Sequence, residues 1–216
     1  MTLQMRVYVP EHPLIRHWLA VARDVNTPSV LFKTAMTELG RWLTYEASRH
    51  WLPTVEAKVQ TPLAECPAVL INPQVPVAVI PILRAGLALL EGAQTLLPLA
   101  SIYHLGVVRD ENTLQASCYF NKLPVNFDPE TRLLLLDPML ATGGSILLAL
   151  EEAVKRGAKP ELIKIVCVVA APPALRQLSL KYPDLTIYTA IIDEGLNSKG
   201  YIIPGLGDAG DRAFGT

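Results

Sequence analysis

A group of hydroxyl, glycine and carboxylate residues follows the most apolar run of the chain. After Leu133 to Leu136 comes Asp-Pro-Met-Leu-Ala-Thr-Gly-Gly-Ser, which occupies Asp137 to Ser145, and a helical pattern begins directly behind it. Glycines let the backbone approach an anion closely, and the first turn of a helix has N–H groups without intrahelical partners. The segment predicts a phosphate-binding loop. Asp137, at the strand end, is placed to accept hydrogen bonds from a sugar diol while the loop holds a phosphate on the same sugar.

The chemistry of this loop is narrowed by what it lacks. It has no lysine of the Walker A type, so the pattern does not favour hydrolysis of a nucleoside triphosphate. An ordinary left-handed turn with a helix cap is the alternative, but a cap uses one glycine and one Ser or Thr. The string from Thr142 to Ser145 contains two glycines and two hydroxyl residues. We therefore interpret it as an anion site.

Two arginines follow neighbouring apolar runs. Arg84 comes after Val77 to Ile82 in a region without other charges, and Arg109 comes after the next run. A surface ion pair is the alternative for each, more so for Arg109 because Asp110 and Glu111 follow it. Ligands of parallel sheets collect at the carboxyl ends of the strands. Two guanidinium groups there, beside a phosphate loop, suit a substrate with more than one phosphate.

The C-terminal run Tyr201 to Arg212 contains Gly-Leu-Gly-Asp-Ala-Gly, a literal Gly-x-Gly-x-x-Gly. The dinucleotide fingerprint also needs a following helix and an acidic residue about 20 positions on, which the sequence does not reach before Thr216. We expect these glycines to fold exposed backbone around a small flat ligand instead. Asp193 and Glu194 are candidates for contact with a metal or base, with a solvated turn as the alternative.

The elements that position these segments alternate along the chain. Five runs rich in Val, Ile and Leu are continuous rather than alternating, which predicts strands buried on both faces. They lie at Val77 to Ile82, Ser101 to Val107, Leu133 to Leu136, Ile163 to Val169 and Thr186 to Ile192. Helical patterns lie at Ser29 to Trp51, Ala85 to Leu97, Ser145 to Arg156 and Ala174 to Tyr182. The alternation predicts an α/β fold with a mainly parallel open sheet flanked by helices.

The polar connection from Arg109 to Thr131 is predicted to be a long functional loop. Elsewhere the chain is apolar: of 216 residues 50% are hydrophobic and only 18% charged. The charge-free stretch Cys66 to Leu83 holds four prolines, so it does not predict a membrane span. We expect one domain over residues 1–216, with the apolar excess buried in its core or at a subunit interface.

Compartment and partners are bounded by charge and cysteine content. Charges at Arg6 and Glu11 precede any apolar signal-peptide region, so we expect a cytoplasmic protein. A net charge of −1 argues against a general nucleic-acid binder. Three cysteines without a Cys-x-x-Cys pair predict reduced thiols, isolated in the core, rather than a disulfide frame or zinc site. They are Cys66, Cys118 and Cys167.

Three of these segments together resemble the signatures of the uracil phosphoribosyltransferases, within the type I phosphoribosyltransferases. They are Pro81 to Gly86, Asp137 to Ser145 and Tyr201 to Arg212, and shorter similarities extend over nearly the whole chain. The resemblance implies an α/β fold with a small hood formed by the terminal segments. It also implies a pyrimidine-salvage reaction in which uracil and 5-phosphoribosyl diphosphate (PRPP) give UMP and diphosphate, with Mg²⁺.

The resemblance carries over to single residues. It implies PRPP contacts at Arg84, Arg109, Asp137, Pro138, Met139, Leu140, Ala141, Thr142, Gly143, Gly144, Ser145 and Asp208. It implies uracil contacts, mainly through backbone, at Ile202, Gly207, Asp208 and Ala209. We expect no nucleophilic side chain, because diphosphate departure leaves an oxocarbenium-like sugar and the protein needs mainly to stabilise charge. Mg²⁺ is expected to bind through the diphosphate of PRPP, with no residue assigned to it.

Some features depart from the family or stay open. Val108 stands where the family usually has Tyr, and Arg49 to Gln74 matches poorly. Many bacterial members are reported as GTP-activated oligomers, so GTP as effector and a homo-oligomer, dimer or tetramer, are expectations without assigned residues. Two rival hypotheses are an RNA-binding regulator that keeps the fold and an enzyme of the same fold for another base. The net charge counts against the first, and the C-terminal run against both.

Overall fold

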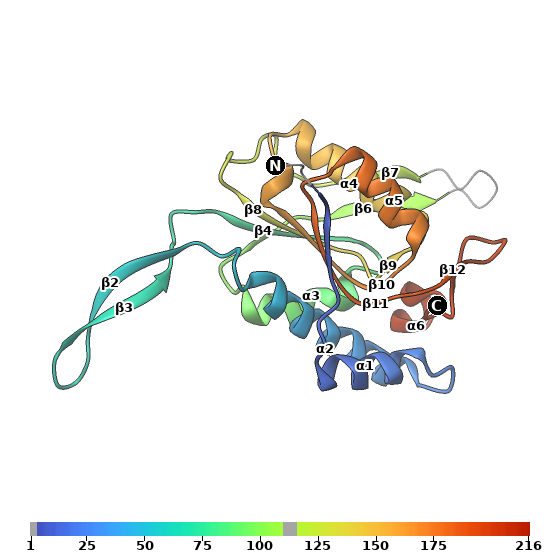
Figure 1. Ribbon diagram of the computed structural model, residues 1–216, viewed down its shortest axis with the longest axis horizontal. Helices are drawn as coiled ribbons and strands as arrows, with labels where there is room; N and C mark the ends of the chain where they lie inside the picture. Colours follow the sequence, from blue (N-terminus) through green and yellow to red (C-terminus); the bar gives the residue numbers. More distant parts are fainter. Residues whose placement is uncertain (1–3, 110–115) are drawn as a thin grey trace.

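The computed structural model describes residues 4–109 and 116–216, and within them it shows a nine-stranded sheet (Figure 1). The strand order is β1-β11-β10-β8-β4-β6-β7, with β5 beside β4 and β9 beside β10. Every pairing is parallel except that of β6 with β7. The strands are β1 (Arg6–Tyr8), β4 (Val77–Leu83), β5 (Ser101–Ile102), β6 (Leu105–Arg109), β7 (Ala116–Asn121), β8 (Arg132–Leu136), β9 (Met139–Leu140), β10 (Ile163–Ala170) and β11 (Thr186–Ile192).

Helices cover both faces of the sheet, as Figure 1 shows. One layer contains α1 (Pro13–Arg23), α2 (Ser29–Ser48), α3 (Leu87–Leu96) and α6 (Ala209–Phe214), and the other contains α4 (Gly144–Lys155) and α5 (Pro172–Lys181). In β8, Leu134 and Leu136 pack in the first layer's core, while Leu133 and Leu135 pack in the second. All four are fully buried. For β8 this confirms that the continuous apolar run is a strand covered on two sides.

The predicted strands and helices are present with modest changes in their ends. The run Ser101 to Val107 is two strands, β5 and β6, which pair with different parts of β4. The predicted loop from Arg109 to Thr131 contains β7, so its description as one long loop was wrong; residues 110–115 of it lie outside the described part of the chain. β7 pairs antiparallel with β6 and forms a sheet edge that the βα pattern did not indicate.

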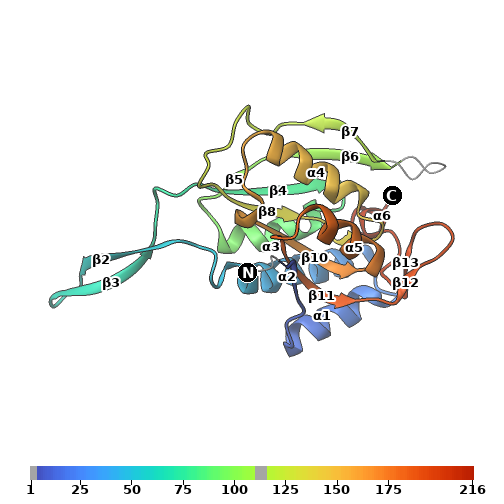
Figure 2. The ribbon, with the colours of Figure 1, turned by 45° about the horizontal axis from the view of Figure 1, so that its top comes forward.

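A hairpin of β2 (Thr54–Gln60) and β3 (Glu65–Ile71) projects from the body (Figures 1 and 2). It carries exposed apolar side chains, including Leu63 at 96% exposure and Val69 at 68%. The expectation that all three cysteines lie in the core was wrong for two of them: Cys66 on this hairpin is half-buried and Cys118 on β7 is exposed. Only Cys167, on the central strand β10, is buried.

The C-terminal segment forms a small group of elements beside the sheet. The short strands β12 (Gly195–Leu196) and β13 (Ile202–Ile203) form a separate antiparallel pair, and α6 follows them. Figure 2 shows this C-terminal group near the end of α1. A 3-10 turn, η1 (Pro160–Leu162), precedes β10. Among the described residues no helix combines the length and apolar character needed to cross a membrane.

Candidate active site

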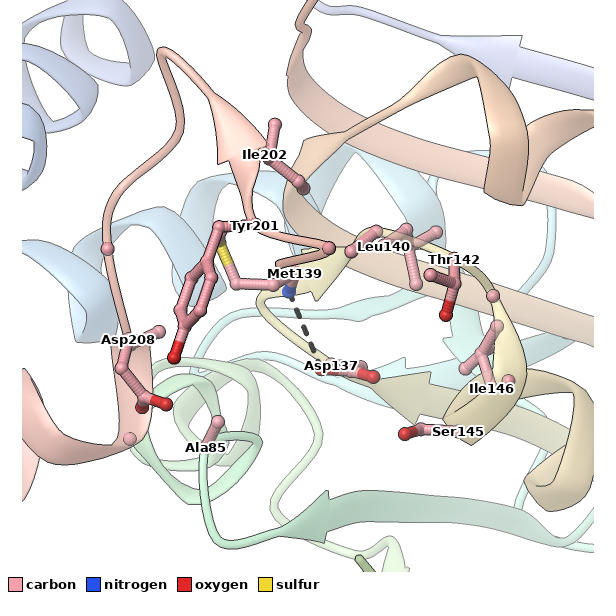
Figure 3. A pocket seen from close by; sticks show the side chains of 17 residues that line it. Ala85, Asp137, Met139, Leu140, Thr142, Ser145, Ile146, Tyr201, Ile202 and Asp208 are labelled. Carbon is pink, nitrogen blue, oxygen red and sulfur yellow. Dashed lines mark hydrogen bonds between the residues drawn. The ribbon is translucent and has the colours of Figure 1, made fainter. Parts of the chain in front are cut away.

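A pocket opens at the carboxyl ends of the central strands. Residues that directly follow β4 and β8 line it, and the segment between β12 and α6 closes the far side. Figure 3 shows Tyr201 and Asp208 on one side, Thr142 and Ser145 on the other, and Asp137 between them. Segments about 60 residues apart in sequence therefore share one cavity because parallel strands end at a common edge. The lining residues are Ala85, Asp137, Met139 to Ile146, Gly200 to Ile202 and Gly207 to Gly210.

The predicted phosphate-binding loop, Asp137 to Ser145 (the phosphate loop), takes its shape from local structure. Gly143 is the N-cap of α4 with φ +93°, a left-handed conformation that favours glycine. A Cβ at this position would lie 3.2 Å from the Ala174 Cα. No side chain caps α4, so within the described residues its first-turn N–H groups have no side-chain acceptor and lie at the pocket. A helix start in this state can bind an anion.

Asp137 is the acidic residue at the floor of the pocket. It is 9% exposed, and its Oδ1 accepts one weak hydrogen bond from the Met139 N–H at 3.4 Å. Burial raises the pKa of the Asp137 carboxyl to about 7, because desolvation outweighs this single bond. Its second oxygen has no hydrogen-bond donor among the described residues. A pair of ribose hydroxyls would supply the donors that a buried carboxylate needs.

Two of the residues expected to contact PRPP, Pro138 and Arg84, are not among the lining residues that the structure describes. Pro138 is not part of the lining; its carbonyl accepts the N–H groups of Val168 and Val169 and so holds the loop on β10. Arg84 follows β4 at the pocket rim, 55% exposed, and its Nη2 lies 2.8 Å from the Asp211 Oδ1 in α6. The backbone of Arg109 ends β6, while its side chain lies outside the described part of the structure.

The four residues expected to contact uracil all line the pocket. Ile202 and Ala209 are buried, at 4% and 3% exposure, and Asp208 is the N-cap of α6, where its Oδ1 accepts the Asp211 N–H at 2.9 Å. Sequence reasoning had assigned no contact to five further lining residues: Ala85, Ile146, Gly200, Tyr201 and Gly210. Three of these lie inside the signature segments, which was the available signal.

Asp193 does not line the pocket, and the proposal that it touches a metal or base is wrong. It is neither solvated nor free, since it is 5% exposed and its carboxylate lies 2.5 Å from the Arg23 guanidinium. Its other oxygen accepts the Gly205 N–H at 2.9 Å. The residue is therefore part of the scaffold behind the C-terminal wall of the pocket, Tyr201 to Gly210.

Fold and site together define a class. A mainly parallel sheet whose β8 end carries an Asp-to-Ser phosphate loop, facing a glycine-rich C-terminal wall, is that of a type I phosphoribosyltransferase. A solved adenine phosphoribosyltransferase from Leishmania donovani shares the fold, with a TM-score of 0.55 and 13% identity, over 93% of this chain and 88% of that one.

More similar proteins narrow the class to a family. The family described as uracil phosphoribosyltransferase matches residues 9–216. A uracil phosphoribosyltransferase from Nostoc sp. is 71% identical over all of both chains. A solved structure from Aquifex aeolicus has a TM-score of 0.87 and 37% identity, covering 96% of this chain and 97% of that one. The chain belongs to the uracil phosphoribosyltransferase family.

Proposed function

We propose that this chain transfers the phosphoribosyl group of PRPP to uracil, giving UMP and diphosphate. The observation that carries the proposal is the single pocket in which a helix-start phosphate loop, a buried carboxylate and a glycine-rich wall meet. In the reaction the bond from sugar C1 to the diphosphate oxygen breaks, a bond from C1 to uracil N1 forms, and the N1 proton is released. Family membership supports the same assignment.

Each part of the pocket has a role in this proposal. The N–H groups at the start of α4 and the hydroxyls of Thr142 and Ser145 bind the 5′-phosphate. Asp137 accepts hydrogen bonds from the ribose hydroxyls. Arg84 and Arg109 bind the diphosphate and stabilise the charge that develops on it as it leaves. This charge stabilisation requires no covalent intermediate with the protein.

Mg²⁺ is proposed as the cofactor, bound mainly by the substrate. Within residues 4–109 and 116–216, no three His, Cys, Asp or Glu side chains are grouped so as to hold a metal ion. A pocket that offers few protein carboxylates fits Mg²⁺, because this ion retains several waters and binds largely through substrate phosphates. Asp137 and Asp208 are the pocket carboxylates that lie where they could contact it. When bound, the ion supplies charge neutralisation to the leaving diphosphate.

Base recognition is proposed to rest on the backbone from Gly207 to Ala209. Uracil presents an acceptor, donor, acceptor edge, whereas cytosine places an amino group against an N–H that backbone geometry holds in place. An unpaired buried polar group costs about 1–3 kcal/mol, which separates the two bases by about five- to 150-fold. Ile202 and Tyr201 supply apolar surface for the ring.

The test is diphosphate release from PRPP and Mg²⁺ in the presence of single bases. We expect release with uracil, none with hypoxanthine or orotate above the rate without base, and release with cytosine at least about fivefold lower than with uracil. Release with hypoxanthine or orotate in place of uracil would overturn the base assignment while leaving the phosphoribosyl chemistry intact. Salt-dependent binding of RNA at physiological ionic strength would instead support the regulator hypothesis.

Wider properties are also proposed. We propose a homo-oligomer, dimer or tetramer, because the β2–β3 hairpin carries exposed apolar side chains away from the body. Residues 1–216 are proposed to act as one domain, since two core clusters pack on opposite faces of one sheet. A cytoplasmic location is proposed from the free thiols. GTP as an effector is a proposal from family membership, and no residue is assigned to it.

A further inference from the structure

The C-terminal wall of the pocket is attached to the end of α1, a helix about 180 residues earlier in the chain. The contacts converge on three consecutive residues, Ala22, Arg23 and Asp24, which end the helix and follow it. None of the three lines the pocket. They reach the wall through two polar side chains, those of Asp193 and Arg212, which the proposed chemistry does not use.

Asp193 makes the first attachment. Its side chain is 3% exposed and lies between two donors, the Arg23 guanidinium at 2.5 Å from Oδ1 and the Gly205 N–H at 2.9 Å from Oδ2. Gly205 has φ +58°, and a Cβ there would lie 2.2 Å from the Ile202 carbonyl oxygen. The turn from Ile202 to Gly205 is therefore tight and is held at its last N–H by Asp193. Ile202 itself lines the pocket.

Arg212 makes the second attachment from the other side of the same segment. Its Nη1 donates to the carbonyls of Ala22 at 2.6 Å and Leu206 at 2.8 Å, and its Nη2 donates to the carbonyl of Asp24 at 2.7 Å. The guanidinium also lies over the buried Phe32 ring, 4.2 Å from its centroid. Arg212 thus links the end of α1 to the residue that directly precedes Gly207.

We infer that Asp193 and Arg212 are positioning residues that place the proposed base-binding backbone through the end of α1, and so determine the affinity for the base rather than for PRPP. The inference rests on the proposed function, because it assumes that the base lies against residues 202–209. Asp193 holds Gly205, two residues before Gly207. Arg212 holds Leu206 and is itself part of α6. Displacing either moves the N–H groups that face the base.

The phosphate loop has independent support, which makes the inference selective. Pro138 and Leu140 accept hydrogen bonds from backbone N–H groups of β10 and its end, at Val168, Val169 and Ala171. These bonds do not pass through α1 or the C-terminal wall. Weakening the wall should therefore raise the KM for uracil and leave the KM for PRPP nearly unchanged.

The test is an isosteric change, Asp193→Asn, in the full chain. A carboxylate accepts from both facing donors, but the amide has one acceptor and one NH₂ group, so one donor must face another donor. We expect the KM for uracil to rise about tenfold, the KM for PRPP to change by less than about twofold, and kcat to change little. A general loss of structure would move both KM values or reduce the folded fraction in urea.

A second variant and two controls complete the experiment. Arg212→Lys keeps the charge and removes the planar fork, so we expect the same selective rise in the uracil KM; it decides the question if Asp193→Asn does not fold. Glu152→Gln removes a half-buried ion pair with Arg156 in α4, away from the wall, and should change neither KM selectively.

Ile202→Ala tests the proposed base site itself, because it removes apolar side-chain surface that lines the pocket and is proposed to contact the ring. If Ile202→Ala raises the uracil KM and neither Asp193→Asn nor Arg212→Lys does, the positioning inference is wrong and the base site stands. If none of the three raises it, or if the PRPP and uracil KM values rise together in the Asp193 and Arg212 variants, the inference is overturned. An unchanged uracil KM in Ile202→Ala alone contradicts the proposed contact of Ile202 with the base.

Discussion

The two walls of the pocket are held in place by different means. The phosphate loop, Asp137 to Ser145, lies between one strand and the helix that follows it, and its shape comes from Gly143 and from backbone bonds to the adjacent β10. The C-terminal wall, Tyr201 to Gly210, depends on Asp193, Arg212 and the end of α1. In the proposed function, local geometry suffices to bind the phosphate, whereas the base is bound by backbone that distant parts of the chain must hold.

The largest effect is expected from a substitution in the phosphate loop. Gly143→Ala places a Cβ at φ +93° and 3.2 Å from the Ala174 Cα, which costs about 1–3 kcal/mol of strain or shifts the loop. A displacement of about 1 Å is enough for a hundredfold fall in kcat/KM for PRPP. Diphosphate release and urea unfolding measure the two effects.

Gly195→Ala is the matched control for this change, because a Cβ there would have no atom within 4 Å and its φ is not in the left-handed region. It should leave both activity and stability close to those of the unmodified chain. If Gly143→Ala behaves like Gly195→Ala, the loop does not depend on its left-handed cap, and the proposed difference between the walls fails.

Arg84 lies between the two walls, since it follows β4 and pairs with Asp211 of α6. Arg84→Ala should lower kcat/KM for PRPP about thirtyfold, because the guanidinium's charged hydrogen bond to the diphosphate is lost. Both partners are about half exposed, so the stability cost should stay below about 1 kcal/mol. Steady-state kinetics with PRPP varied, beside thermal unfolding, gives both numbers.

Arg49→Ala is the control for Arg84→Ala, because Arg49 is similarly exposed and pairs with Glu46 at the C-terminal end of α2, and neither residue lines the pocket. Its loss should not affect PRPP kinetics. Equal kinetic constants in the Arg84 and Arg49 variants would show that Arg84 serves only as a surface ion pair, which was the alternative from the sequence.

The pH dependence tests Asp137 in the phosphate-loop wall. With a pKa of about 7 the carboxyl is mostly protonated at pH 6 and mostly ionised at pH 8, so kcat/KM for PRPP should rise about tenfold across that interval. The stability of the free protein should move the other way. The unfolded chain loses this proton near 3.8 and the folded one near 7, so stability falls as pH rises between those values.

Asp137→Asn should remove both slopes at once, although its activity will be low at every pH. Residual slopes in this variant belong to the substrates or to other groups. A wild-type chain whose stability does not fall between about pH 4 and pH 7 relative to Asp137→Asn would contradict the raised pKa.

The smallest effect is expected on the other wall. Tyr201→Phe removes a hydroxyl that has no hydrogen-bond partner among the described residues and keeps the ring that lines the pocket. The uracil KM should change by no more than about twofold, in line with about 0.5 kcal/mol for a surface substitution. A change above tenfold would mean that the hydroxyl contacts a substrate and that backbone alone does not select the base.

The sequence predicted the central strands of the sheet well and the more exposed elements around it poorly. The strands β4, β8, β10 and β11 are buried on both faces, so their apolar runs are unbroken and easy to recognise. The hairpin β2–β3 packs on neither face and has no such pattern, and α1 is recognisable only by an amphipathic stretch of 11 residues. Burial produces the signal, and exposed elements lack it.

The same reason separates residues within the site. Asp137 and the Thr142 to Ser145 string were found because strand end, glycines and helix start are consecutive. Asp193 was misjudged as a possible ligand because its partners, Arg23 and Gly205, lie 170 and 12 residues away. Nothing near Asp193 in the sequence indicates that it is buried and paired.

Sequence alone therefore determined the parallel sheet, the phosphate loop at the end of β8 and the family signatures, because each arises from consecutive residues with a regular burial pattern. Only the tertiary structure decided that Pro138 supports the loop from behind, that Arg84 pairs with α6, and that the end of α1 holds the C-terminal wall. Such contacts depend on where distant segments pack, and local composition does not encode the partner of a buried charge.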